Sequence, residues 1–231
     1  MGAIGGAALL LLFPDRVRRV LVPCLVSYAT GTLLGAAFLG MIPAGAARAP
    51  VQAVTATVLA GVIGFFVLEK LVVWRHCHRP HCDTHPRAGP LLLVGDAFHN
   101  FVDGVMIAAA LVTSVPLGVS AALATIAHEV PQEVGDFAIL LEDGYSRGRA
   151  FVLNALSSVA TLPGALVGWA FLDEAREGLP YVLAISAASF VYVATADLIP
   201  ALHARVGLGH TVRQVALIAA GIATIAAFRL G

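Results

Sequence analysis

The stretch DAFHNFVDG at residues 96–104, followed by HEVPQEVGD at residues 128–136, decides how this chain folds. Each motif stands near the middle of an apolar segment, at about residues 91–114 and 117–141. The two segments are joined by a short link at residues 113–118. Antiparallel helices with so short a connection hold their midpoints at the same depth. We therefore expect the two motifs to face each other.

Within each motif, the polar residues recur at helical spacing. Residues three, four and seven positions apart share one face of a helix. In the first motif this face carries Asp96, His99, Asn100 and Asp103. In the second motif it carries His128, Glu129, Gln132, Glu133 and Asp136. Each helix is therefore predicted to present one polar stripe on an otherwise apolar surface.

The composition is that of a protein embedded in a lipid bilayer. Of the 231 residues, 59% are hydrophobic and only 12% are charged, and the mean hydropathy is +0.88. A soluble domain of this length needs more charged surface, so we expect a polytopic membrane protein. The balanced net charge gives no indication of a nucleic-acid partner. The three cysteines, Cys24, Cys77 and Cys82, do not form a disulfide framework.

Apolar segments predict an all-α bundle in a single domain, residues 1–231. Residues 1–13 are apolar but extend only ~20 Å as a helix, short of the ~30 Å hydrocarbon core. We interpret them as the remainder of a truncated first helix, because no basic residue precedes them and no small-residue cleavage site follows, as a signal peptide requires. The bundle then has eight membrane helices. The seven full spans fall at about residues 20–42, 51–74, 91–114, 117–141, 150–172, 179–202 and 211–228.

Basic residues alternate between successive loops. The loops after the first, third, fifth and seventh helices hold eleven Lys and Arg residues, whereas the other loops hold two. The positive-inside rule places the basic loops in the cytoplasm and both termini outside. The Ala-, Gly- and Arg-rich composition is typical of a bacterial plasma membrane protein. Gly31, Gly35, Gly61 and Gly64 suit close helix contacts, within the chain or in a homodimer.

The acids in the two motifs need compensation. An ionisable side chain at the centre of a membrane helix costs ~2.5–3.5 kcal/mol on insertion scales, and neither segment contains Lys or Arg. Imidazole, carboxylate and amide oxygen are ligands that a divalent transition metal accepts. A self-contained hydrogen-bond network is the alternative. Two histidines and five acids on facing stripes favour a bound or passing metal ion.

Other polar residues extend this hypothesis. The loop at about residues 75–90 holds half of the eight histidines, and we interpret it as a cytoplasmic metal-catching tract rather than an ordinary solvated loop. Its candidate ligands are His76, Cys77, His78, His81, Cys82 and His85. A polar stripe at residues 154–161 suits hydrogen bonds between helices better than metal ligation. The candidate pathway residues outside the central motifs are Asp96, Asp136, Asn154, Ser158 and Asp197.

The paired motifs resemble those of the ZIP (Zrt-, Irt-like) family of divalent metal transporters. They are most similar to the branch whose second motif reads HExPHExGD. The resemblance implies eight helices, a binuclear metal site between the fourth and fifth, and transport of Zn²⁺, or of Fe²⁺, Mn²⁺ or Cd²⁺, into the cytosol. It implies a first subsite of His99, Asp103, His128 and Gln132. It implies a second subsite of Asn100, Asp103, Glu129 and Gln132, with Glu133 nearby.

The chain departs from the family pattern in three respects. Gln132 stands where that branch has His, Gly40 and Ala44 in the second helix replace the His and Glu that many members carry, and the first helix is incomplete. Two alternatives to a transporter stay open. An intramembrane metalloprotease is one alternative, since His128-Glu129 begins a His-Glu-x-x-His motif. Gln132 takes the place of the second His that such an enzyme needs, so we expect no enzyme. A metal sensor or scaffold without flux is the other alternative.

Overall fold

The computed structural model describes residues 5, 13–74, 89–172, 177–203 and 207–230, and within these ranges it contains helices and no strands. The expected all-α fold is therefore confirmed there. The expected first helix and the His- and Cys-containing loop fall largely on residues 1–12 and 75–88, outside the described residues. Both stay predictions. The described helices, in chain order, are α2 Asp15–Gly35, η1 Ala36–Met41, α3 Ile42–Ala46, α4 Val51–Trp74, α5 Gly89–Thr113, α6 Val115–Glu142, α7 Arg147–Ser158, α8 Thr161–Leu172, α9 Leu179–Tyr192, η2 Val193–Leu198, α10 Ile199–His203 and α11 Leu208–Leu230.

Each of the seven predicted full spans coincides with a helical stretch of the structure. Five of these stretches are long and apolar enough to cross a membrane: Arg19–Ala46, Val51–Leu68, Arg147–Phe171, Leu179–His203 and Leu208–Ala227. Helices α5 and α6 are not among them. The total of eight membrane helices stays a prediction.

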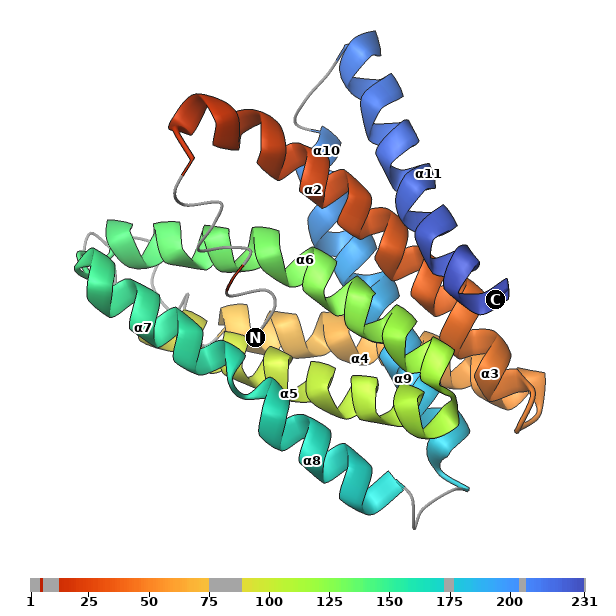
Figure 1. The fold of residues 1–231 in the computed structure, drawn as a ribbon. Helices are drawn as coiled ribbons and strands as arrows, with labels where there is room; N and C mark the ends of the chain where they lie inside the picture. The colour runs from red at the N-terminus through yellow and green to blue at the C-terminus, as the bar shows by residue number, and fades with distance from the viewer. Residues whose placement is uncertain (1–4, 6–12, 75–88, 173–176, 204–206, 231) are drawn as a thin grey trace.

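A single residue reverses the chain between the two motif-bearing helices. Ser114, extended at φ −166°, caps the N-terminus of α6, and its hydroxyl accepts a hydrogen bond from the Leu117 amide at 3.3 Å. Pro116 follows in the first turn, where its missing N–H costs no helical bond. Helices α5 and α6 therefore run antiparallel and pack side by side (Figure 1). The expected juxtaposition of the two motifs is confirmed.

One expected helix, at residues 150–172, is divided in two. Helix α7 ends at Ser158 and α8 begins at Thr161. Pro163 has no N–H, so the Val159 carbonyl loses its partner four residues ahead. The Leu162 amide bonds to that carbonyl instead, at 3.0 Å, and the Ala160 amide bonds to the Ser157 carbonyl at 3.0 Å. The break thus follows from a proline in the first turn of α8.

Glycines allow two pairs of helices to approach closely. A Cβ at Gly104 of α5 would collide with the Thr161 carbonyl of α8, and one at Gly164 of α8 would collide with the Phe101 carbonyl of α5. Helices α2 and α11 cross in the same reciprocal way at Gly31 and Gly221. The backbones therefore touch at both crossings, as small residues permit in membrane proteins.

The four glycines that were expected to allow close helix contacts differ in the space around them. A Cβ at Gly35 would lie 3.2 Å from Ile225, and one at Gly61 would lie 2.6 Å from the Ala188 side chain of α9. Gly64 has open space around it among the described residues. Three of the four thus serve contacts within the chain, and the homodimer stays a prediction.

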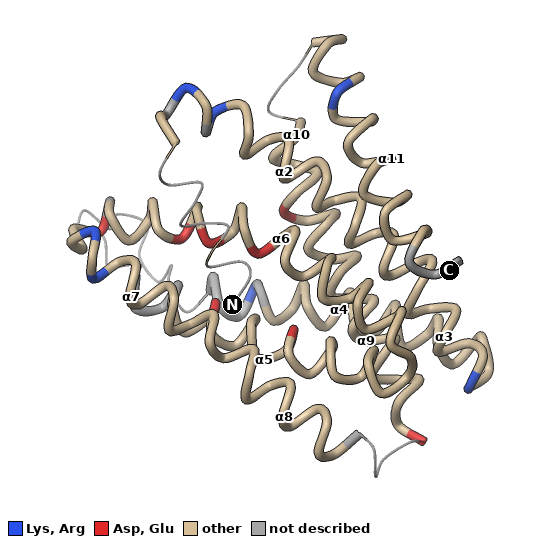
Figure 2. Tube along the Cα trace, in the orientation of Figure 1, with Lys and Arg blue, Asp and Glu red and all other residues tan. Residues whose placement is uncertain are grey.

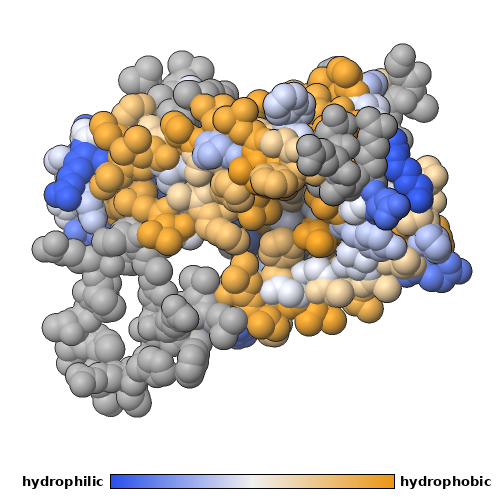
Figure 3. Space-filling model, turned by 90° about the horizontal axis from the view of Figure 1, so that it is seen from below, coloured by the Kyte–Doolittle hydropathy of each residue, from blue (hydrophilic) through white to orange (hydrophobic). Residues whose placement is uncertain are grey.

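The outer surface is apolar, and the charges are separated along the bundle. On α4, Leu59, Ile63 and Phe66 are half-exposed or more. Hydrophobic residues cover much of the middle of the face in Figure 3, and hydrophilic residues gather toward its two ends. Acidic residues line the interior stretches of α5 and α6, whereas basic residues stand near helix ends (Figure 2). This distribution suits a hydrocarbon environment around the middle of the bundle.

Candidate metal site

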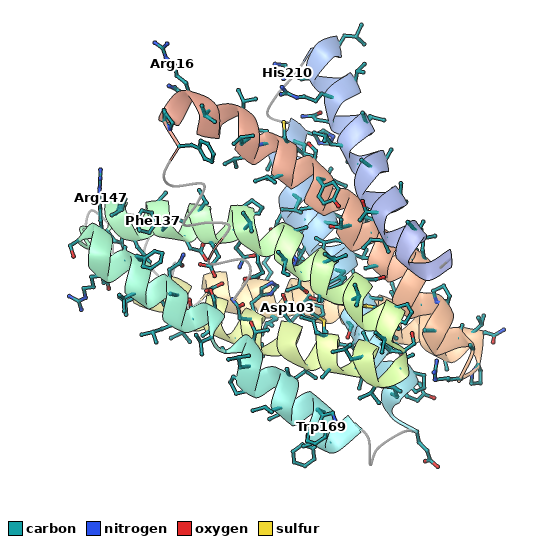
Figure 4. The ribbon with its side chains drawn as sticks, in the orientation of Figure 1. Arg16, Asp103, Phe137, Arg147, Trp169 and His210 are labelled. Atoms are coloured by element: carbon teal, nitrogen blue, oxygen red, sulfur yellow. The ribbon has the colours of Figure 1, made fainter. Side chains whose placement is uncertain are left out.

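Four side chains from the two motifs converge between α5 and α6. His99 and Asp103 come from α5, and His128 and Glu129 come from α6. One potential ligand atom from each lies within 4.8 Å of all the others. Figure 4 shows Asp103 in the space between the two helices. We call this set the four-residue cluster.

The potential ligand atoms of the cluster lie close to one another. The Nε2 atoms of His99 and His128 are 3.2 Å apart. Asp103 Oδ2 lies 3.8 Å from His99 Nε2 and 3.4 Å from His128 Nε2. Glu129 Oε1 lies 3.6 Å from His99 Nε2 and 3.5 Å from His128 Nε2. Two nitrogens and two carboxylate oxygens are therefore close enough together to be considered as ligands of one ion.

Burying the two carboxylates of the cluster costs free energy. Asp103 is fully buried and Glu129 is 2% exposed. Both oxygens of each carboxylate lack a hydrogen-bond partner in the described structure. A buried carboxylate needs hydrogen bonds or a counter-charge, and here the nearby basic groups are the two imidazoles. A cation at the centre of the cluster would supply the missing charge.

The helix backbone orients one of the imidazoles. His128 is 1% exposed, and its Nδ1 lies 3.0 Å from the Ala124 carbonyl. A neutral imidazole that donates from Nδ1 presents the lone pair of Nε2, which is the atom that faces the cluster. The edge of Phe190, from α9, packs against the ring with centroids 6.1 Å apart. His128 is thus held as a metal ligand would be, whereas the His99 side chain remains 24% exposed.

The two amides predicted as ligands are turned toward Asp96. The Nδ2 of Asn100 donates to Asp96 Oδ1 at 3.1 Å, and the Nε2 of Gln132 donates to the same oxygen at 3.1 Å. The Oδ1 of Asn100 accepts a hydrogen bond from the Thr161 hydroxyl at 3.0 Å. Asn100 and Gln132 therefore lie beside the four-residue cluster and link Asp96 to the start of α8.

The remaining candidates occupy three different places. Glu133 is buried, and its carboxylate accepts a hydrogen bond from Ser158. Asn154 donates to the Glu133 carbonyl at 2.9 Å, so the polar stripe of α7 binds α6 as expected. Asp136 is also buried on α6. Asp197 is exposed on η2, and it is not part of the four-residue cluster.

The sequence reasoning missed one contributor to the site. Phe190 contacts His128 from a helix with no polar motif, so no local signal marks it. Thr161, the last residue of the polar stripe at residues 154–161, donates to Asn100, which fits the hydrogen bonds between helices expected of that stripe. Gly40 lies in η1 and Ala44 in α3, where neither residue brings a ligating side chain.

Comparison with known proteins identifies the family of this site. Residues 74–229 match the family model described as ZIP Zinc transporter. The chain belongs to the ZIP family. It is 30% identical to zinc transporter ZIP13 of Pongo abelii over 223 residues, which are 89% of this chain and 66% of that protein. It is 36% identical to zinc transporter ZIP10 of Danio rerio over 131 residues, 54% of this chain and 16% of the relative.

A third zinc transporter is also similar to the chain. The chain is 41% identical to zinc transporter ZIP4 of Mus musculus over 112 residues, 48% of this chain and 17% of that protein. The chain thus spans between 16% and 66% of the lengths of these three relatives. The matches confirm the expected ZIP family. ZIP proteins are integral membrane transporters and not enzymes, so the metalloprotease alternative is set aside.

Proposed function

We propose that this ZIP chain carries divalent transition-metal ions across the membrane, with Zn²⁺ as its main substrate and the four-residue cluster as its binding site. The spacing of the cluster is the observation that carries the proposal. Zinc bonds to imidazole nitrogen and carboxylate oxygen at ~2.0–2.2 Å in tetrahedral sites, which sets the ligand atoms ~3.3 Å apart. The separations that involve an imidazole nitrogen run from 3.2 to 3.8 Å, and all four ligand atoms lie within 4.8 Å of one another. Fe²⁺, Mn²⁺ and Cd²⁺ are further substrates to test, because the donor set is one that these ions also accept.

Charge favours one direction of passage. His99 is the partly exposed member of the cluster, so we propose that its imidazole exchanges with the water of a hydrated ion. The ion then passes to the buried ligands and on toward the end of the bundle that carries Arg147 (Figure 4). By the positive-inside rule that end faces the cytoplasm, in the plasma membrane of a bacterium, and the cargo enters the cell.

A second ion requires a local rearrangement. Asn100 and Gln132 now donate their amide nitrogens to Asp96. To ligate a metal, their amide oxygens would have to turn toward Asp103 and Glu129. We propose that the binuclear state forms when the two amides release Asp96, with Glu133 beside the second ion.

Uptake into liposomes tests the function. We expect purified wild-type protein to carry Zn²⁺ into proteoliposomes containing a zinc-sensitive dye. His99→Ala should lower the initial rate at least ~10-fold, because loss of even a partner outside the ligand shell costs ~10–100-fold and His99 is itself a proposed ligand. His210→Ala, an exposed histidine at the start of α11, is the matched control and should transport normally. Zn²⁺ binding without uptake would instead support a sensor or scaffold.

The unusual glutamine offers a gain-of-function test. A neutral amide oxygen is a weaker ligand for Zn²⁺ than imidazole, so Gln132→His should tighten Zn²⁺ binding by ~10-fold. Equilibrium dialysis of the protein in detergent micelles measures this change, with Gln214→His on α11 as the matched control. Unchanged affinity in Gln132→His would show that position 132 does not reach the ion.

A further inference from the structure

A second level of acids lies beside the four-residue cluster. Asp96 precedes Asp103 by seven residues on α5, and Asp136 follows Glu129 by seven residues on α6. Seven residues correspond to ~10 Å along a helix. Because α5 and α6 are antiparallel neighbours, both displacements point toward the end of the bundle where α7 begins. In Figure 4, Phe137, the neighbour of Asp136 in the chain, lies between Asp103 and Arg147.

These acids are buried and incompletely satisfied. Asp96 is 5% exposed, Asp136 is 7% exposed and Glu133, one turn before Asp136, is 1% exposed. The Oδ2 atoms of Asp96 and Asp136 have no hydrogen-bond partner within the described ranges. Asp96 is also near enough to repel both Glu133 and Asp136 electrostatically. Three buried carboxylates therefore lie where α5, α6 and α7 meet, without converging on one point.

The groups around these carboxylates are polar but mostly neutral. On α5 and α6 they are the amides of Asn100 and Gln132, both bonded to Asp96. From α7, Ser157 lies beside Asp96 and Ser158 bonds to Glu133. His99, at the edge of the four-residue cluster, is the nearby basic group that acts on Asp96. Neutral donors hold the carboxylates in place, but they do not balance the charge of three of them.

We propose that Asp96, Glu133 and Asp136 form a second cation station, separate from the four-residue cluster, which holds a partly hydrated divalent ion. Among the described residues, ligand atoms of three or more such side chains gather closely at the four-residue cluster and not at this station. Carboxylates set wider apart suit an ion that keeps some of its water. The cargo named for the station rests on the proposed function, whereas its capacity to bind a cation does not.

The station is coupled to the cluster through Asp96. One carboxylate oxygen of Asp96 accepts from both amides, and the other has no hydrogen-bond partner within the described ranges. An ion that draws the Asp96 carboxylate toward the station weakens those two hydrogen bonds. Asn100 and Gln132 then become free to turn toward the cluster. Occupation of the station and rearrangement of the cluster are thus linked events.

Zinc stoichiometry and flux test the station together. Equilibrium dialysis with Zn²⁺ alone, on the full chain in detergent micelles, should show that Asp136→Asn loses about one weakly bound ion per chain while the tight site keeps its affinity. Uptake into proteoliposomes should fall by ~10-fold, as expected for the loss of one charged partner. Asp96→Asn should behave alike. Asp136→Glu should retain binding and uptake, and Asp143→Asn, just beyond α6, is the matched control.

The outcomes separate this proposal from the proposed function. Wild-type stoichiometry and uptake in both Asn variants would overturn the station, whatever the cluster does. If wild-type protein shows no uptake, transport fails as the function, and the loss of a weak ion in Asp136→Asn still supports the station. If Asp136→Asn changes only the pH dependence of uptake, with unchanged Zn²⁺ stoichiometry, the Asp136 carboxylate binds a proton and not a metal ion, and the station is refuted. Thermal unfolding in micelles, unchanged in the Asn variants, confirms that they are folded.

Discussion

Replacing Asp103 with Asn should reduce Zn²⁺ uptake by ~100-fold or more while leaving the metal-free protein as stable as the wild type, or more stable. The carboxylate contacts both imidazoles of the cluster and is fully buried. Removing one partner from a buried charged set costs ~3–5 kcal/mol, and each 1.4 kcal/mol is a tenfold change in affinity. The bound ion loses this energy, so transport fails.

The expected gain in stability comes from the same burial. Both Asp103 oxygens lack a hydrogen-bond partner within the described residues, so in the metal-free protein the nearby imidazoles of His99 and His128, and not hydrogen bonds, offset its buried charge. A carboxamide keeps the shape and removes that charge. Thermal unfolding in micelles, with and without a chelator, should show that Zn²⁺ stabilises the wild type but not Asp103→Asn. Asp143→Asn should respond to Zn²⁺ as the wild type does. A variant that loses stability even with chelator present would instead make Asp103 a structural residue.

Much of the site could be predicted because its signals are local. Helical spacing placed Asp96, His99 and Asp103 on one face, and the short link at residues 113–118 set the second motif against the first. Acids in a membrane segment have no water to solvate them, which predicted that they need a cation as partner. These inferences need only the repeat of the helix and the length of a loop, both of which are read directly from the chain.

Other features depend on contacts that no local pattern records. The spacing predicted that Asn100 and Gln132 lie on the correct faces, but their rotamers depend on which neighbour binds them, and Asp96 does so in this structure. Phe190 reaches His128 through the packing of α9 on α5, a tertiary contact between distant segments. The division of α7 from α8 was readable in principle, because Pro163 is in the sequence. It was missed because the apolar character of residues 150–172 continues across the break.

Replacing Gly104 with Ala should destabilise the protein by ~1–3 kcal/mol, and replacing it with Val by more, because an added side chain has no room at this crossing. A Cβ at Gly104 would meet the Thr161 carbonyl and the Ala165 amide of α8, which are backbone atoms that cannot turn aside. The helices α5 and α8 would have to separate. Since Asp103 precedes Gly104 in the chain, the same shift moves a ligand of the cluster, and Zn²⁺ uptake should fall with stability.

Replacing a second glycine of the same helix should change stability in the opposite direction. Gly95 is exposed on α5, and a Cβ there would meet nothing within 4 Å among the described residues. Gly95→Ala should therefore stabilise the helix by ~0.5–1 kcal/mol, the difference between the two residues in a helix interior. Thermal unfolding in micelles compares the two variants directly. Gly164→Ala should resemble Gly104→Ala, and the double variant should cost less than the sum, because one separation of α5 from α8 relieves both collisions. Equal effects of Gly95→Ala and Gly104→Ala would mean that the two helices do not touch at this crossing in the membrane.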